Sequence, residues 1–359
     1  MRIVVDGLPY PVIASDDGPR EIARIAAASE HRAIVVSDLN VQSRGDVIAR
    51  SLEEGGHAVA LAVAIPAGER RKHWKAVSDL HAAWAAAGAD RHTLVIAVGG
   101  GTLTDVAGFA AATFMRGLPW LAVPTTVLGM VDAAIGGKTG VDRPEGKNLI
   151  GSIWQPAGVV LDLVALETLA VAQRKTGMAE IVKAAVVGDP SLLDAAEGFD
   201  VASAPQQWAG LLAQAAAVKA KVVAKDPLDL GGRAVLNLGH TFAHAIEHAS
   251  RYRVTHGAAV ALGLRAAGVL ARDRTGWPKA HHHRMLHALR RAGLRVVTRG
   301  LSLDDIISAM RHDKKRVDGV PRFVLPVRLG EVRPGVFVPE DEVRGALSAL
   351  EAPVESAGW

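Results

Sequence analysis

Between residues 32 and 142 the sequence alternates between short aliphatic runs and Ala-rich stretches, and this alternation restricts the fold more than any other feature. The aliphatic runs cover residues 33–36, 58–64, 93–98 and 120–123. Strands that alternate with helices indicate βαβ units and a parallel sheet. The run at 94–98 contains no polar residue, as expected of a strand buried on both faces. We therefore expect an α/β domain with a parallel sheet in the first half of the chain.

The second half of the chain has a different pattern. After about residue 170 the strand signals mostly disappear, and long Ala, Leu, Val and Arg stretches with a helical period replace them. A chain of 359 residues with 49% hydrophobic content is long enough for two domains of ordinary size. We expect an α/β domain over residues 1–170 and a mainly helical domain over residues 171–359.

A glycine-rich turn, Gly99-Gly100-Gly101, follows the apolar run at 94–98 and precedes an expected helix at 106–113. Glycines at such a junction allow backbone N–H groups to approach a pyrophosphate at the positive end of the helix. The pattern lacks the G-x-G-x-x-G fingerprint, so a tight structural turn is the alternative. A second cluster, Gly136-Gly137-Lys138-Thr139-Gly140, lacks the spacing of a P-loop.

Potential metal ligands gather in the stretch 233–247 and in the His256-Gly257 pair. If the stretch is helical, Asn237, His240, Thr241 and His244 project from one side. Cysteine is absent, so any metal must be held by His, Asp or Glu. The spacing of His240 and His244 would also suit two histidine ligands on one zinc ion.

The composition argues against several classes of partner. The net charge is +4, but basic and acidic residues are interspersed, and aromatic residues make up 4% of the chain, which offers few stacking platforms for nucleic acid. The N-terminus lacks the long apolar stretch of a secretory signal, and no segment resembles a membrane span. We expect a cytoplasmic protein that binds small anionic ligands and neither nucleic acid nor membranes.

Taken together, the motifs resemble those of 3-dehydroquinate synthases, in the sugar phosphate cyclase group, over nearly the whole chain. The matching blocks occur in one order, which is more specific than any single motif. They are Pro66-Ala-Gly-Glu69-Arg-Arg-Lys72, the glycine turn with Asp105, Met115-Arg116-Gly117, Val123-Pro-Thr125-Thr126, Val131-Asp132 with Gly-Gly-Lys138-Thr139, Gly146-Lys147-Asn148-Leu-Ile-Gly151, Met178-Ala-Glu180 with Lys183, the 233–247 stretch, His256-Gly257 and Asp313-Lys314-Lys315.

The resemblance implies a Rossmann-like N-terminal domain, a helical C-terminal domain, bound NAD, a divalent metal such as zinc or cobalt, and a homodimer. For the metal it implies the ligands Glu180, His240 and His256, with His244 as a substrate-contacting or proton-relay residue. The cofactor-binding residues that it implies are Asp38, Asn40, Glu69, Lys72, Gly100, Gly101, Asp105, Thr125, Thr126, Lys138 and Lys147.

For the substrate, the resemblance implies a sugar acid with a carboxylate at one end and a phosphate at the other. Lys219 and Arg233 would hold the carboxylate. The phosphate would be held by Lys138, Asn237, one of Lys314 and Lys315, and Arg116 of a neighbouring subunit. The further catalytic residues implied are Lys183 and Asp132 at the ring hydroxyls, and Asn148.

The activity implied is the conversion of 3-deoxy-D-arabino-heptulosonate 7-phosphate to 3-dehydroquinate and phosphate, a step of the shikimate pathway of aromatic amino acid biosynthesis. NAD would act in an internal redox cycle without being consumed. Aminodehydroquinate synthase and the other sugar phosphate cyclases are alternatives, although cyclases whose substrates lack a carboxylate have no use for the Lys219 and Arg233 clamp. A metal-dependent polyol or glycerol-phosphate dehydrogenase is the alternative of another class.

Two further features bear on the site and on packing. Ala258 stands where the family often has Glu, which removes a possible carboxylate behind the metal ligands. His281-His282-His283 lies in an Arg- and Ala-rich amphipathic stretch, and we expect it on a solvated helix face. Trp74 and Trp84 are expected to be core or interface anchors.

Overall fold

The computed structural model describes residues 1–27, 32–66, 68–298, 300–311, 316–317 and 320–353. The chain forms two compact units. Unit 1 contains Met1–Ala170 and Ser203–Leu228, and unit 2 contains Val171–Ala202 and Asp229–Trp359. The expectation from the sequence placed everything after residue 170 in one domain, whereas the helix at 208–225 belongs to unit 1.

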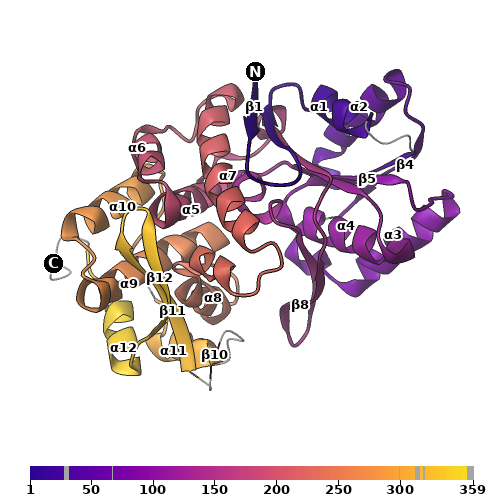
Figure 1. Ribbon diagram of the computed structural model, residues 1–359. Coiled ribbons are helices and arrows are strands. Elements are labelled where there is room, and N and C mark those ends of the chain that lie inside the picture. Colours follow the sequence, from indigo (N-terminus) through magenta and orange to yellow (C-terminus); the bar gives the residue numbers. More distant parts are fainter. Residues whose placement is uncertain (28–31, 67, 299, 312–315, 318–319, 354–359) are drawn as a thin grey trace. The chain divides into compact units, whose positions relative to one another are not determined.

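Unit 1 is an α/β unit, and Figure 1 labels several of its strands and helices. The strands are β1 (Arg2–Val5), β2 (Val12–Ser15), β3 (Ala33–Asp38), β4 (Val59–Ile65), β5 (Leu94–Gly99), β6 (Trp120–Pro124), β7 (Lys138–Arg143), β8 (Gly146–Ile153) and β9 (Gly158–Asp162). The helices are α1 (Gly18–Ala26), α2 (Gln42–Glu54), α3 (Trp74–Ala86), α4 (Gly101–Thr113) and α7 (Trp208–Lys225). Short helical segments are η1 (Leu39–Val41), η2 (Glu69–Arg71), η3 (Phe114–Arg116), the π-helical η4 (Gly129–Ala133), η5 (Leu163–Leu166) and η6 (Pro205–Gln207).

Seven strands of unit 1 form one sheet in the order β1-β2-β9-β6-β5-β3-β4. All neighbouring pairs are parallel except β1 and β2. The predicted parallel α/β sheet is therefore confirmed, and the aliphatic runs at 33–36, 58–64, 93–98 and 120–123 coincide with β3 to β6. The glycine turn opens α4 at Gly101, earlier than the helix start expected at residue 106.

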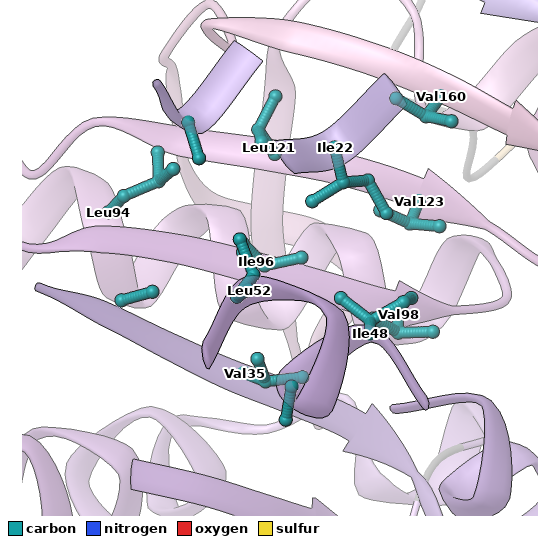
Figure 2. Close-up of a cluster of buried hydrophobic side chains, with 13 residues drawn as sticks. Ile22, Val35, Ile48, Leu52, Leu94, Ile96, Val98, Leu121, Val123 and Val160 are labelled. Carbon is teal, nitrogen blue, oxygen red and sulfur yellow. The ribbon is translucent and has the colours of Figure 1, made fainter. Parts of the chain in front are cut away.

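Alternate residues of the central strands form a core on one face of this sheet (Figure 2). Ile96 and Val98 of β5 pack there with Ile22 of α1 and with Ile48 and Leu52 of α2. The intervening residues Val95 and Ala97 are also fully buried, and α4 packs on β5 and β6. Because both faces are covered, β5 and β6 contain no polar side chain and do not alternate between polar and apolar residues.

Unit 2 is mainly helical. Its helices are α5 (Val171–Gly188), α6 (Pro190–Gly198), α8 (His240–Ala249), α9 (His256–Thr275), α10 (Lys279–Arg291), α11 (Leu303–Arg311) and α12 (Glu340–Ser348), with the short η7 (Gly232–Asn237). The strands β10 (Arg316–Val317), β11 (Val320–Arg328) and β12 (Glu331–Phe337) form an antiparallel sheet. The sequence analysis did not anticipate this sheet. None of the helices in the described part of the chain is both long and apolar enough to span a membrane.

The triple histidine corrects one expectation. His283 is exposed, but His282 is 1% exposed and points at α9, where Gly268 leaves room for its ring. A Cβ atom at Gly268 would lie 2.2 Å from Nδ1 of His282. Burial, helped by the positive charges of His283 and Arg265, lowers the pKa of His282 to about 3. The ring is therefore a neutral core residue, and the prediction of a wholly solvated face was wrong.

Burial of His282 should make the protein sensitive to acid. The unfolded chain takes up a proton at His282 near pH 6.5, whereas the folded state resists it until about pH 3, so stability is lost as the pH falls through this window. We expect wild type to lose roughly 1–2 kcal/mol more than His282→Leu between pH 7 and pH 5 in urea unfolding. His283→Leu is the matched control and should follow wild type. Equal losses in wild type and His282→Leu would contradict the prediction.

Candidate active site

Three side chains from three helices of unit 2 converge on one point. They are Glu180 of α5, His240 at the start of α8 and His256 at the start of α9. Each offers one ligand atom, and these atoms lie within 4.8 Å of one another. Nε2 of His256 is 3.1 Å and Nε2 of His240 is 3.4 Å from Oε1 of Glu180. Among the described residues, this is the group of His and acidic side chains with the geometry to hold a metal ion.

Close backbone contacts bring these helices together. Gly239 has φ 77°, a conformation that permits the abrupt start of α8 at His240, and its backbone touches Gly263 of α9. A Cβ atom at Gly263 would lie 2.1 Å from the carbonyl oxygen of Gly239. A Cβ atom at Gly257 would lie 2.3 Å from the carbonyl oxygen of Thr176 on α5. Glycine at these positions therefore allows α5, α8 and α9 to place their ligands together.

The break at Gly239 changes the expected arrangement of the 233–247 stretch. His240, Thr241 and His244 belong to α8, but Asn237 ends η7, so it does not share their helix. The His244 ring lies 5.5 Å from the His240 ring, yet His244 is not in the metal-ligand group. Of the two ligand choices open from the sequence, the geometry favours the pair His240 and His256.

The electrostatics of the cluster suit a cation. Burial raises the pKa of Glu180, but the buried Lys183 ammonium and the two imidazoles outweigh this effect and bring the pKa well below its usual range. Burial and Lys183 lower the pKa of His240, which keeps its ring neutral. Burial opposes protonation of His256, but hydrogen bonds to Glu180 and Glu247 raise its pKa overall. Two imidazoles and one ionised carboxylate form a donor set that catalytic zinc sites use.

In unit 1, several of the residues predicted to bind NAD lie at the carboxyl ends of the sheet strands. The chain leaves β3 for β4 on one side and returns to β5 on the other, so β3 and β5 flank the point where the strand order reverses. Ligands of open parallel sheets bind outside the carboxyl ends of the strands at such a point. Asp38 ends β3, and Gly100 and Gly101 follow β5. Thr125 and Thr126 follow the neighbouring strand β6.

Two ion pairs join charged residues that are predicted to bind NAD. Nζ of the buried Lys72 is 2.5 Å from Oδ2 of Asp105. Burial raises the pKa of Asp105 to about 6, although the Lys72 charge opposes the rise. Nζ of Lys147 is 2.7 Å from Oε1 of Glu69. These contacts bring together, in pairs, four residues that the resemblance assigns to NAD.

Two further ion-pair and capping contacts involve predicted site residues of unit 1. Lys219 of α7 donates to the carboxylate and the main-chain carbonyl of Asp132 in η4. Asp38 accepts from the backbone and side-chain amides of Asn40. The sequence analysis assigned Lys219 to the helical domain, but in the structure its helix packs on β1, β2 and η4 of unit 1.

The remaining predicted residues differ in exposure. Arg233 is buried in η7, Asn237 is half-buried and His244 is exposed. Lys138, Asn148 and Arg116 are exposed, and Asn148 and Arg116 have positive φ angles of 51° and 69°. Lys314 and Lys315 lie outside the described residues. Glu247, which the sequence analysis mentioned only as the end of a stretch, lies beside His256.

The fold and the site define a class: two-unit proteins with a Rossmann-like unit and a helical unit in which Glu180, His240 and His256 could together hold a metal ion. The N-terminal domain profile of 3-dehydroquinate synthase matches residues 62–176, and the C-terminal profile matches residues 177–316. The chain belongs to the 3-dehydroquinate synthase family.

Curated relatives agree with this assignment. The 3-dehydroquinate synthase of Synechococcus sp. is 38% identical, over 98% of this chain and 97% of its own length. The 3-dehydroquinate synthase of Microcystis aeruginosa is 41% identical over 86% of each chain.

Solved structures of two cyclases share the fold. A 2-epi-5-epi-valiolone synthase from Streptomyces hygroscopicus, with NAD+ and Zn2+ bound, is 30% identical with a TM-score of 0.84, covering 96% of this chain and 98% of that one. A 2-deoxy-scyllo-inosose synthase complexed with carbaglucose-6-phosphate, NAD+ and Co2+ is 25% identical with a TM-score of 0.84, covering 97% and 99%. An NADH-dependent butanol dehydrogenase from Thermotoga maritima, 16% identical over 98% of this chain and 99% of that one, shares the fold alone at a TM-score of 0.63.

The contact between Gly239 and Gly263 can be tested directly. Gly263→Ala places a methyl group against a backbone carbonyl, so α8 and α9 must separate. We expect the variant to lose about 1–3 kcal/mol of stability and to bind Zn2+ more weakly, because His240 and His256 sit on the two helices. Isothermal calorimetry and urea unfolding measure both effects. Gly345→Ala in α12, where a Cβ atom meets nothing within 4 Å, is the control and should not lose Zn2+ affinity.

Proposed function

We propose that the chain converts 3-deoxy-D-arabino-heptulosonate 7-phosphate to 3-dehydroquinate and phosphate, with NAD as a catalytic cofactor and zinc or cobalt as the metal. The observation that carries the proposal is the Glu180, His240 and His256 cluster, in a chain whose curated relatives are 3-dehydroquinate synthases. Two structural neighbours with the same fold bind NAD+ together with Zn2+ or Co2+. The proposed reaction belongs to the shikimate pathway of aromatic amino acid biosynthesis.

The donor chemistry of the chain fits both cofactors. Glu180, His240 and His256 would hold the metal, and a set of three protein ligands leaves positions open for substrate oxygens. The NAD residues would be those at the edge of the sheet, with Asp38, Asn40, Glu69 and Lys72 toward the adenosine. When bound, NAD supplies a reversible hydride acceptor, and the metal supplies a Lewis acid that stabilises negative charge on substrate oxygens.

The proposed anchors for the substrate's two anionic ends follow the chemistry of the side chains. A guanidinium binds a planar carboxylate with two parallel hydrogen bonds, whereas an ammonium presents a point charge. By the family resemblance, Arg233 and Lys219 would hold the carboxylate, and the guanidinium of Arg233 has the matching geometry. Lys138, Asn237, one of Lys314 and Lys315, and Arg116 of a second subunit would hold the phosphate. Such fixed contacts at both ends orient the ring for reaction.

Proton transfers would fall to residues beside the metal cluster and to the substrate. Lys183, which is buried and paired with Glu180, would donate a hydrogen bond to a ring hydroxyl and hold it in place. Asp132 and Asn148 would orient the ring from unit 1. The substrate's own phosphate would take the proton in the elimination, and His244, which is exposed in unit 2, would relay protons or orient groups.

The proposal extends to the assembly and its location. A homodimer would allow Arg116, which is exposed, to reach the phosphate of a substrate bound by another subunit. We also propose a cytoplasmic location, because the proposed substrate is a small water-soluble metabolite.

The alternatives are less well supported. Sibling cyclases whose substrates lack a carboxylate would make no use of Arg233 and Lys219 as a carboxylate clamp. Aminodehydroquinate synthase, whose substrate is very similar, is the closest alternative. A polyol or glycerol-phosphate dehydrogenase is not favoured, since the solved structures of maleylacetate and sulfoacetaldehyde reductases and of alcohol dehydrogenases are similar to the chain in fold alone, at 15–18% identity.

The first test follows phosphate release and the absorbance of NADH in one cuvette. Metal-loaded protein with a catalytic amount of NAD should release phosphate from 3-deoxy-D-arabino-heptulosonate 7-phosphate through many turnovers without accumulating NADH. Removing the metal with a chelator should abolish release, and adding Zn2+ or Co2+ should restore it. Stoichiometric NADH production would instead indicate a dehydrogenase, and no phosphate release from a folded, loaded sample would direct the search to the sibling substrates.

The carboxylate clamp is tested by Arg233→Gln and Arg233→Lys. Losing a charge-assisted hydrogen bond costs about 1.5–3 kcal/mol, so kcat/KM should fall on the order of 10- to 100-fold for Arg233→Gln, with higher KM and lower kcat. Arg233→Lys keeps the charge but loses the paired geometry and should be intermediate. Arg284→Gln, which removes an ion-paired surface arginine of unit 2, is the control. An unchanged kcat/KM in Arg233→Gln would refute the assignment.

A further inference from the structure

Glu247 of α8 lies beside the metal cluster without belonging to it. Its Oε2 is 3.5 Å from Nδ1 of His256, while Nε2 of the same ring faces Glu180 at 3.1 Å. Glu247 is 7% exposed, so its carboxylate is held in place by the surrounding helices and is largely screened from water. The two nitrogens of His256 thus face two different carboxylates, one in the proposed ligand set and one behind it.

The other imidazole, that of His240, is held by a main-chain carbonyl group instead of a carboxylate. Nδ1 of His240 lies 3.1 Å from the main-chain carbonyl oxygen of Leu238, which can only accept a hydrogen bond. That acceptor fixes the tautomer with a proton on Nδ1 and leaves Nε2 of His240 free to bind a cation. The ring nitrogens of His256, at the start of α9, instead face the Glu180 and Glu247 side chains, so the orientation of this ring depends on side chains.

We propose that Glu247 is a positioning residue of the metal centre: its carboxylate accepts the Nδ1–H of His256 and holds Nε2 toward the cation. The inference rests on the proposed metal ligands. It also explains how the site can have Ala258 where the family often has Glu. Ala258 has no acceptor group, but Glu247 supplies a carboxylate beside His256. The carboxylate behind His256 comes from α8, at the end of the same stretch that supplies His240.

Metal affinity provides the main test. Zn2+ dissociation constants are measured for the metal-free protein by competition with a chromophoric chelator. Partners behind metal ligands typically contribute about 10- to 100-fold in affinity, so we expect about 10-fold weaker binding for Glu247→Gln and up to about 100-fold for Glu247→Ala. Glu247→Asp keeps the charge and should bind more tightly than Glu247→Gln. The matched control is Glu197→Gln, which removes a partly buried, ion-paired carboxylate of α6 in the same unit.

Two more variants separate this inference from the proposed function. Glu180→Gln and His240→Ala should each abolish tight Zn2+ binding. If they do so while Glu247→Gln and Glu247→Ala stay within twofold of wild type, the positioning role is wrong and the ligand set stands. If Glu180→Gln and His240→Ala leave the affinity unchanged, the ligand set itself is wrong.

A spectroscopic readout distinguishes positioning from a merely structural role. In the Co2+-loaded protein, the Nδ1–H protons of both ligand imidazoles should give shifted NMR signals that exchange slowly with water. Glu247→Ala should speed the exchange of one signal and leave the other, because Leu238 still accepts from His240. Glu247→Asp should keep both signals slow and secures the test if Glu247→Ala does not fold. Two unchanged signals in Glu247→Ala would overturn the inference.

Discussion

The burial of the Glu180 carboxylate is the constraint on which unit 2 depends. A carboxylate in the middle of a buried helix is costly unless cations or donors surround it. Lys183 lies one turn further along α5 and pairs with Oε2 of Glu180. His240 of α8 and His256 of α9 both lie next to Oε1. The two imidazoles that help to stabilise the carboxylate are thus the ones that would bind a metal ion together with it. The same arrangement gives stability to the helical unit and prepares its site.

That arrangement requires helices closer together than ordinary side chains permit. The backbones of α8 and α9 touch at Gly239 and Gly263, and α9 touches α5 at Gly257. Two of these glycines are direct neighbours of ligands: Gly239 precedes His240, and Gly257 follows His256. The glycine beside each histidine ligand therefore has a geometric role: it allows two helices to come close together, and this brings the histidine to the other ligands.

The sequence predicted the parallel sheet well because its strands are buried on both faces and carry a strong local signal. It predicted the metal cluster through several motifs in one order, and the structure brings Glu180, His240 and His256 together. Other features depend on packing that no local pattern reveals. His282 is buried because Gly268 of another helix leaves space, α7 packs on unit 1 although it follows two helices of unit 2, and β11 and β12 lie in a region without strong strand alternation.

Glu247 illustrates the same limit at the site. It lies seven residues after His240 in the sequence, so a helical pattern places both on one side of α8, but only the position of α9 shows that its carboxylate meets His256. Fold similarity does not decide the chemistry either, because reductases share this fold at TM-scores of 0.63–0.65 and cyclases at 0.82–0.84. What would distinguish a 3-dehydroquinate synthase is a set of cations for a substrate with a carboxylate and a phosphate. The residues proposed for the carboxylate, Arg233 and Lys219, lie in η7 and α7, outside both the sheet and the group of metal ligands.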